Sequence, residues 1–154
     1  MLITTHVASG AVVGRLARRP ATALLLGVVS HFTLDRIPHW GRPNVGPPPG
    51  MDAVALRVAV TDGLVGLAAI AAVTAATPRS HRVPVLAGIV GACLPDVDKP
   101  SELFFGRSPY PRWVDDAHSR LQEGRESPDL LVRDGVLALL GAAAVVAALR
   151  QQPR

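Results

Sequence analysis

The residues best suited to chemistry are histidines and aspartates that occur in short groups. The first group is HFTLDRIPH, from His31 to His39. His31 and Asp35 are one helical turn apart, so on a helix they would share a face. Neutral imidazole and carboxylate groups are both ordinary zinc ligands, although the same pair can also form a simple hydrogen bond. His39 follows Pro38, where the chain can turn back toward this pair.

A second group, Asp96-Val97-Asp98, comes directly after Pro95 and an apolar segment. Two carboxylates separated by one residue can bind a divalent cation. The same pattern also occurs in ordinary capping turns, so both interpretations stay open. His118 lies in a polar stretch, DDAHSR, which favours a solvated surface helix. It is nevertheless a candidate metal ligand or general acid.

Two further candidates lie inside apolar segments. Asp62 interrupts the run VALRVAVTDGLVGLAAI, and His6 lies near the start of the chain on a similar stretch. A buried carboxylate is unfavourable by several kcal/mol unless it is paired or bound to metal. Asp62 therefore predicts either a metal ligand or a buried ion pair with Arg57 or Arg133. A lone histidine on an apolar segment is more often a core residue, but His6 is one of several histidines that are candidates for the same site.

These residues need a scaffold, and the sequence predicts an all-α one. Prolines and capping residues delimit five helical segments. Their expected ranges are Thr5–Arg18, Ala21–Ile37, Asp52–Ala76, Pro84–Leu94 and Ser127–Arg150. Residues 41–50, GRPNVGPPPG, are expected to form a loop, because neither helices nor strands tolerate so many prolines and glycines. Residues 95–127 are polar, with a short helix expected at Trp113–Gln122. We therefore expect one domain over residues 1–154, built as an antiparallel bundle of about five helices.

The composition favours a membrane. Hydrophobic residues make up 49% of the chain and charged residues 18%, with a mean hydropathy of +0.29. A soluble domain has roughly 25% charged residues. Small aliphatic residues dominate, and they let helices pack closely in lipid. The net charge of +4 would also suit nucleic acid. The basic residues, however, form short clusters without interleaved aromatics, so we expect no nucleic-acid partner.

Charge is expected to divide between the two ends of the bundle, because links between antiparallel helices alternate from end to end. One end would receive basic residues and no acidic ones; these are Arg15, Arg18, Arg19, Arg79, Arg82, Arg150 and Arg154. The other end would receive the acidic residues and four histidines, His6, His31, His39 and His118.

Lys and Arg concentrate in short cytoplasmic loops of membrane proteins. We therefore expect a multi-pass protein of a bacterial-type inner (plasma) membrane. Its arginine end would be cytoplasmic, and its site and residues 95–127 exoplasmic. A soluble bundle is the alternative, because two of the segments are short for a span.

The order of these motifs resembles the YdjM-like family of inner-membrane-associated, metal-dependent hydrolases, which is distantly similar to zinc-dependent phospholipase C. The matching residues are Thr5-His6 with Gly10 and Gly14, Ser30-His31 with Asp35, and LPDVD at 94–98 with Pro100-Ser101 and Gly106. The resemblance covers the first, second and fourth expected helices and, more loosely, His118-Ser119. It implies metal-site roles for His6, His31, Asp35, Asp96 and Asp98. The chain departs from the family pattern at Lys99, where members often have histidine, and in having His118 as its only late histidine.

These observations lead to the hypothesis of a membrane-bound hydrolase that uses one or two divalent metal ions, with zinc expected. Its substrate would be a phosphoester, such as a lipid headgroup. The expected metal ligands are His6, His31, Asp35, Asp62, Asp96 and Asp98, and the candidates for proton transfer are Asp98, His39 and His118. The expected partners are the lipid membrane and a small-molecule or lipid substrate.

Two alternatives stay open. One is a non-catalytic membrane protein in which the polar or metal cluster only ties the bundle together. The other is a small ion transporter centred on Asp62, although the sequence below it, GLVGLAAIAAVTAA, offers no polar path. Substrate, metal identity, number of ions and oligomeric state do not follow from the sequence.

Overall fold

Helices form nearly all of the regular structure in this computed structural model, which describes residues 1–41 and 53–150. The long helices are α1 (Ile3–Ala17), α2 (Pro20–Asp35), α3 (Ala53–Ala76), α4 (Arg82–Cys93) and α7 (Pro128–Arg150). The shorter elements are η1 (Arg79–His81), η2 (Leu94–Val97), α5 (Asp98–Phe105) and α6 (Arg112–Leu121). The expected all-α fold is confirmed. Apart from Gly41, the loop predicted at 41–50 lies outside the described residues.

The structure adds two features that the sequence did not predict. Helix α5 forms although it contains Pro100, because proline in a first turn removes no helical hydrogen bond. Two short strands, β1 (His39–Trp40) and β2 (Gly124–Arg125), pair in parallel. They join the segment after α2 to the segment before α7. Strands of two residues have no alternation by which a sequence pattern could reveal them.

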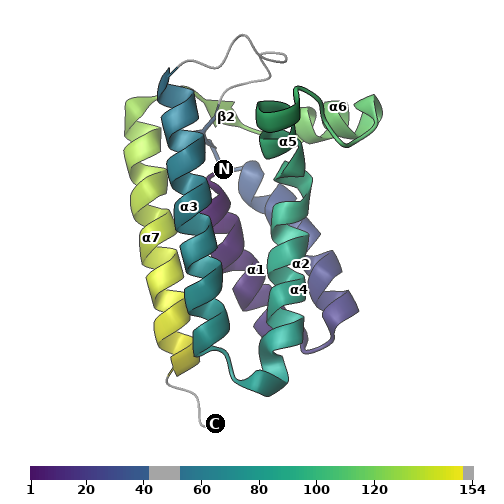
Figure 1. The fold of residues 1–154 in the computed structure, drawn as a ribbon, viewed down its shortest axis with the longest axis vertical. Coiled ribbons are helices and arrows are strands. Elements are labelled where there is room, and N and C mark those ends of the chain that lie inside the picture. The colour runs from purple at the N-terminus through teal and green to yellow at the C-terminus, as the bar shows by residue number, and fades with distance from the viewer. Residues whose placement is uncertain (42–52, 151–154) are drawn as a thin grey trace.

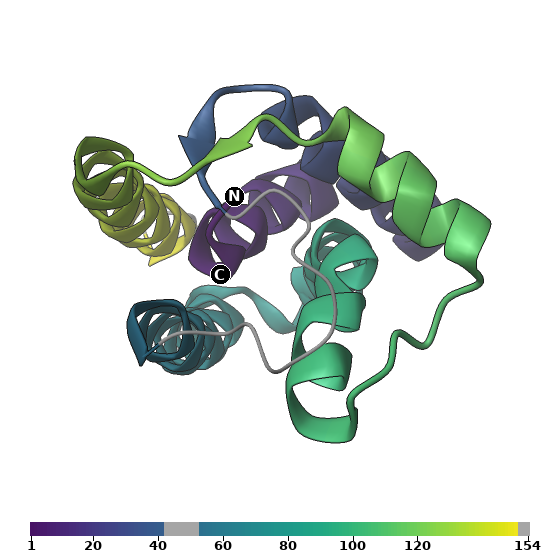
Figure 2. The ribbon, with the colours of Figure 1, turned by 90° about the horizontal axis from the view of Figure 1, so that it is seen from above.

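The centre of the bundle is α1, which lies between the pair α2 and α4 and the pair α3 and α7 (Figures 1 and 2). Helices α1, α2 and α4 touch through their backbones. A Cβ atom on Gly88 of α4 would lie 2.2 Å from the carbonyl oxygen of Gly10 in α1. A Cβ atom on Gly91 would lie 2.1 Å from the carbonyl oxygen of Leu24 in α2. Only glycine permits these crossings, which fix the ends of the three helices relative to one another.

Helices α3 and α7 are long and apolar enough to cross a membrane by length and composition, over Leu56–Ala76 and Pro128–Arg150. Only 17% and 11% of their apolar windows are buried inside the protein. Most of each apolar window is therefore exposed on the surface of the protein.

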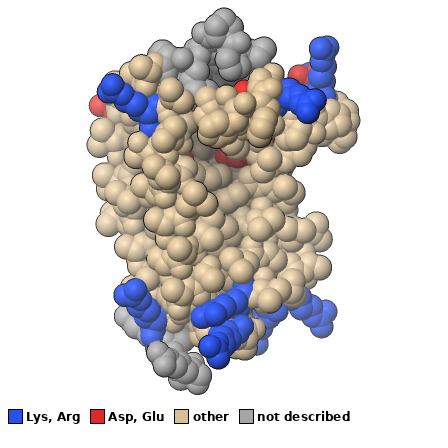
Figure 3. Space-filling view, in the orientation of Figure 1, with Lys and Arg blue, Asp and Glu red and all other residues tan. Residues whose placement is uncertain are grey.

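Charged side chains gather at the two ends of the molecule (Figure 3). The lower end shows only basic side chains on this face, whereas the upper end shows both signs. Between them lies a broad zone without basic side chains. Acidic atoms also appear at the floor of a hollow below the upper end. Among the described residues, the predicted arginine end matches this arrangement, while Arg154 lies outside them.

Candidate metal centre

Four side chains from three elements converge at the end of the bundle where α1 begins and α2 ends. They are His31 and Asp35 of α2, Asp96 of η2 and His118 of α6. Each offers one ligand atom, and these atoms all lie within 4.8 Å of one another. We call this set the His/Asp group. All four residues were candidates from the sequence, and the fold brings them together from positions far apart in the chain.

The spacing of the ligand atoms fits a divalent ion. Ligands about 2.1 Å from a tetrahedral ion are about 3.4 Å from one another. His31 Nε2 lies 3.1 Å from His118 Nε2 and 3.3 Å from Asp35 Oδ2. His118 Nε2 lies 3.6 Å from Asp96 Oδ1. The group therefore has the dimensions of a coordination shell, and His31, Asp35 and His118 are buried.

The imidazole of His31 is oriented for metal binding by α4. Its Nδ1–H donates a hydrogen bond of 2.8 Å to the carbonyl oxygen of Ala92, which can only accept. The lone pair of the neutral ring therefore lies on Nε2, which faces the other members of the group. A backbone carbonyl behind a histidine ligand is a common arrangement in metal sites.

His118 has a carboxylate behind it instead. Its Nδ1 lies 3.7 Å from Asp98 Oδ2, and the same oxygen accepts a hydrogen bond of 3.0 Å from Lys99 Nζ. Burial alone would raise the pKa of Asp98, but the hydrogen bonds from His118 and Lys99 lower it. Burial likewise opposes a charged His118, yet its hydrogen bonds with Asp35 and Asp98 raise its pKa to about 9. Asp98, predicted as a ligand and proton acceptor, is thus placed to orient His118.

His6 of α1 also lies beside the His/Asp group. Its Nε2 lies 3.3 Å from Asp35 Oδ1 and 3.8 Å from Asp96 Oδ2. Its ring stacks on that of His31, with centroids 4.1 Å apart. The side chain is fully buried, and neither ring nitrogen has a hydrogen-bond partner among the described residues. His6 is therefore a member of the site and not a satisfied core histidine.

Gln122 is a site residue that the sequence analysis missed. Its Nε2 lies 2.8 Å from His118 Nε2 and donates a hydrogen bond of 3.2 Å to Asp35 Oδ2. Gln122 follows His118 by one helical turn at the end of α6, so the two side chains can share a face. The spacing of four residues between His118 and Gln122 was the signal that could have identified Gln122. Both residues, however, lie in a segment that was interpreted as a solvated surface helix.

Asp62, predicted to bind metal, is not a member of the His/Asp group. Its carboxylate accepts hydrogen bonds from the backbone N–H of Ile3 (2.5 Å) and of Thr4 (3.2 Å), and from the Thr4 hydroxyl (2.7 Å). The first backbone N–H groups of a helix have no partner within the helix, and negative charge is favourable there. Asp62 therefore caps α1 from the neighbouring helix α3.

His39, predicted to accept a proton, is not a member of the His/Asp group either. It is buried on β1, and its Nδ1–H donates a hydrogen bond of 2.8 Å to the carbonyl oxygen of Ile37. Among the described residues, no hydrogen bond or ion pair joins it to the group. Arg133, one alternative partner for Asp62, instead pairs with Asp134 at 2.8 Å.

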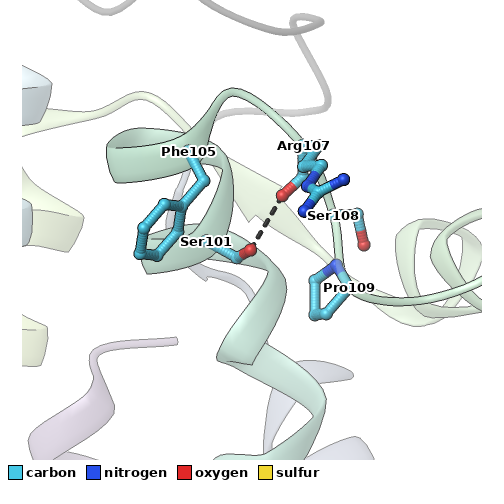
Figure 4. A pocket seen from close by; sticks show the side chains of 5 residues that line it. All are labelled: Ser101, Phe105, Arg107, Ser108 and Pro109. Atoms are coloured by element: carbon cyan, nitrogen blue, oxygen red, sulfur yellow. Dashed lines mark hydrogen bonds between the residues drawn. The ribbon is translucent and has the colours of Figure 1, made fainter.

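A separate pocket of about 450 Å³ lies beside the link between α5 and α6 (Figure 4). Its lining residues are Ser101, Phe105, Arg107, Ser108 and Pro109. The Ser101 hydroxyl donates a hydrogen bond of 2.8 Å to the carbonyl oxygen of Arg107. The pocket contains no histidine or carboxylate, so it lacks the chemistry that the His/Asp group provides.

Comparisons with known proteins add no assignment. No protein-family model, no curated protein and no solved structure matches this chain.

Proposed function

We propose that this chain is a membrane-bound, metal-dependent hydrolase that acts on a phosphoester, such as a lipid headgroup. The observation that carries the proposal is the His/Asp group, whose ligand atoms face one another at one end of the bundle. Two imidazoles and two carboxylates suit a divalent ion, and zinc is the one we expect. The motif resemblance to the YdjM-like family supports the same activity.

The composition of the group favours a hydrolytic site over a structural one. Structural zinc sites are built mainly from cysteine, and Cys93, the one cysteine of the chain, is not in the group. A bound divalent ion would lower the pKa of water toward about 7 and polarise a phosphoryl oxygen. The Ala92 carbonyl and Asp98 would hold the two imidazoles in place. The Gln122 amide lies beside His118 and Asp35, where it could donate a hydrogen bond to a substrate oxygen.

A position at the bilayer surface is supported by exposed apolar side chains. Helices α3 and α7 expose leucines along their length, namely Leu64, Leu67, Leu139 and Leu140. An apolar surface of this kind requires lipid or a partner to cover it. Large aromatic side chains are also exposed around the link between α5 and α6, namely Phe104, Phe105 and Trp113. Tryptophan collects where a membrane meets water, so the exposed Trp113 supports a site within reach of lipid headgroups.

The proposed activity is tested with protein purified in detergent. Bis(p-nitrophenyl) phosphate and a phospholipid in mixed micelles serve as substrates, with zinc or manganese added. We expect metal-dependent hydrolysis of at least one ester, its loss on adding EDTA and its return with metal. His31→Ala should lower the rate by roughly 100-fold or more, since even residues behind a ligand contribute 10- to 100-fold. His81→Ala, at the opposite end of the bundle, is the matched control and should retain activity. If neither ester is hydrolysed in a metal-dependent way, the proposal is refuted.

The proposed membrane topology is tested by cysteine labelling in a Cys93→Ser background. Ser80, between α3 and α4, and Asp116, on α6, are both exposed and lie near opposite ends of the bundle. We expect the protein to stay in membranes washed with carbonate. A membrane-impermeant maleimide added to intact spheroplasts should label Asp116→Cys, and Ser80→Cys only after lysis. The reverse pattern would overturn the orientation, and recovery in the soluble fraction would overturn the membrane location.

One observation favours a non-catalytic role instead. Asp35 accepts hydrogen bonds from Gln122 and from the α-amino group of Met1, at 3.2 and 2.8 Å, so the cluster also ties elements together without metal. The EDTA experiment separates the two roles. The ion-transport alternative has less support, because the carboxylate of Asp62 caps α1.

A further inference from the structure

The His/Asp group leaves one buried imidazole unexplained. His6 is fully buried, and both of its ring nitrogens lack a hydrogen-bond partner among the described residues. A buried polar group without a partner is unfavourable, so the position of this ring calls for a ligand. Its Nε2 nevertheless points at two carboxylate oxygens, Asp35 Oδ1 at 3.3 Å and Asp96 Oδ2 at 3.8 Å. These distances match those between ligands of one ion, so the ring is placed as a ligand.

The two carboxylates present different oxygens to the two sides of the site. Asp35 directs Oδ2 to His31 at 3.3 Å and Oδ1 to His6 at 3.3 Å. Asp96 directs Oδ1 to His118 at 3.6 Å and Oδ2 to His6 at 3.8 Å. Each carboxylate can therefore serve two positions at once, one between His31 and His118 and one beside His6.

We propose that the centre binds two divalent ions bridged by Asp35 and Asp96, and that His6 defines the second position. The first ion would take His31, His118, Asp35 Oδ2 and Asp96 Oδ1. The second would take His6 Nε2, Asp35 Oδ1 and Asp96 Oδ2, leaving coordination positions open. The α-amino group of Met1, 2.8 Å from Asp35 Oδ1, would move aside. This inference deepens the proposed function and rests on it only for the presence of the first ion.

Two ions also narrow the substrate class. Paired ions about 3.5–4 Å apart stabilise the attacking and the leaving oxygen of an in-line displacement at phosphorus. A phosphoester is a substrate class that fits this chemistry.

The proposal is tested by counting ions. Detergent-purified wild-type protein is saturated with zinc, freed of unbound metal and analysed by mass spectrometry. We expect two ions per chain in the wild type and in His81→Ala, and one in His6→Ala. Because His6→Ala could disturb packing against His31, His6→Gln provides a second variant. Manganese-loaded protein gives an independent readout, since two bridged Mn²⁺ ions couple magnetically. The wild type should show a coupled spectrum, and the His6 variants the six lines of isolated Mn²⁺.

The outcomes separate this inference from the proposed activity. Three results would overturn the two-ion inference. They are one zinc ion in the wild type, two zinc ions in both His6 variants, and an uncoupled manganese spectrum in the wild type. A chain that binds no metal would overturn it together with the metal site. Two ions without hydrolysis of any phosphoester would leave it standing and refute only the activity.

Discussion

Asp35→Asn removes metal from the purified protein, whereas Asp62→Asn leaves it bound; this is the first result we expect. Asp35 lies within 3.8 Å of three imidazole nitrogens, those of His6, His31 and His118. An asparagine there keeps the shape but loses the charge and one oxygen. We expect metal affinity to fall by at least about 100-fold, since residues behind a ligand already contribute 10- to 100-fold.

Asp62→Asn is the matched control, because it makes the same chemical change in another helix of the same bundle. Asparagine is uncharged and can accept at one oxygen only, so at least one of the two α1 N–H groups that Asp62 binds loses its acceptor. We expect the metal content to be unchanged and the free energy of unfolding to fall by about 1–2 kcal/mol. Metal content and thermal unfolding in detergent are measured for both variants. Metal loss in Asp62→Asn, with retention in Asp35→Asn, would reverse the two assignments.

The contrast between Asp35 and Asp62 shows which features of the site could be predicted from the sequence. Prolines at helix ends give the order and direction of the helices, so the sequence predicts which residues share an end of the bundle. His6, His31 and Asp96 were assigned correctly to one end in this way. Direction does not say where a residue lies across the bundle. Asp62 lies on α3, and there its carboxylate meets the first turn of α1.

The site residues on α6 were harder to predict, for a different physical reason. Helix α6 is short and mostly polar, so its composition favours a solvated surface helix. His118 and Gln122 therefore look like surface residues in the sequence, yet the fold places both against Asp35. Helix α5 and the strand pair β1–β2 are too short for periodicity to reveal them. The residues that complete the site were consequently predicted less well than those on the long helices.

The second large effect we expect is the loss of both stability and metal in Gly88→Val. A Cβ at residue 88 would lie 2.2 Å from the carbonyl oxygen of Gly10 and 2.9 Å from the Cα of Gly14. These are backbone atoms, so no side-chain rotation can relieve the clash, and α1 must move away from α4. Overpacking usually costs about 1–3 kcal/mol, and more where the backbone must shift. We expect a loss of at least about 3 kcal/mol on that basis.

Metal binding should fail in Gly88→Val because α1 carries His6 and α4 leads directly into η2, which carries Asp96. Separating these helices widens the gap of 3.8 Å between His6 Nε2 and Asp96 Oδ2. Gly63→Ala is the control, since, apart from its own stretch of helix, no atom of the described residues lies within 4 Å of a Cβ there. This variant should keep its metal, and its free energy of unfolding should rise by up to about 1 kcal/mol, because alanine is more favourable than glycine in a helix interior. Thermal unfolding and metal content are measured for both variants. A Gly88→Val protein with wild-type stability and full metal content would mean that α1 and α4 do not cross at this glycine, and that the crossing does not hold the centre together.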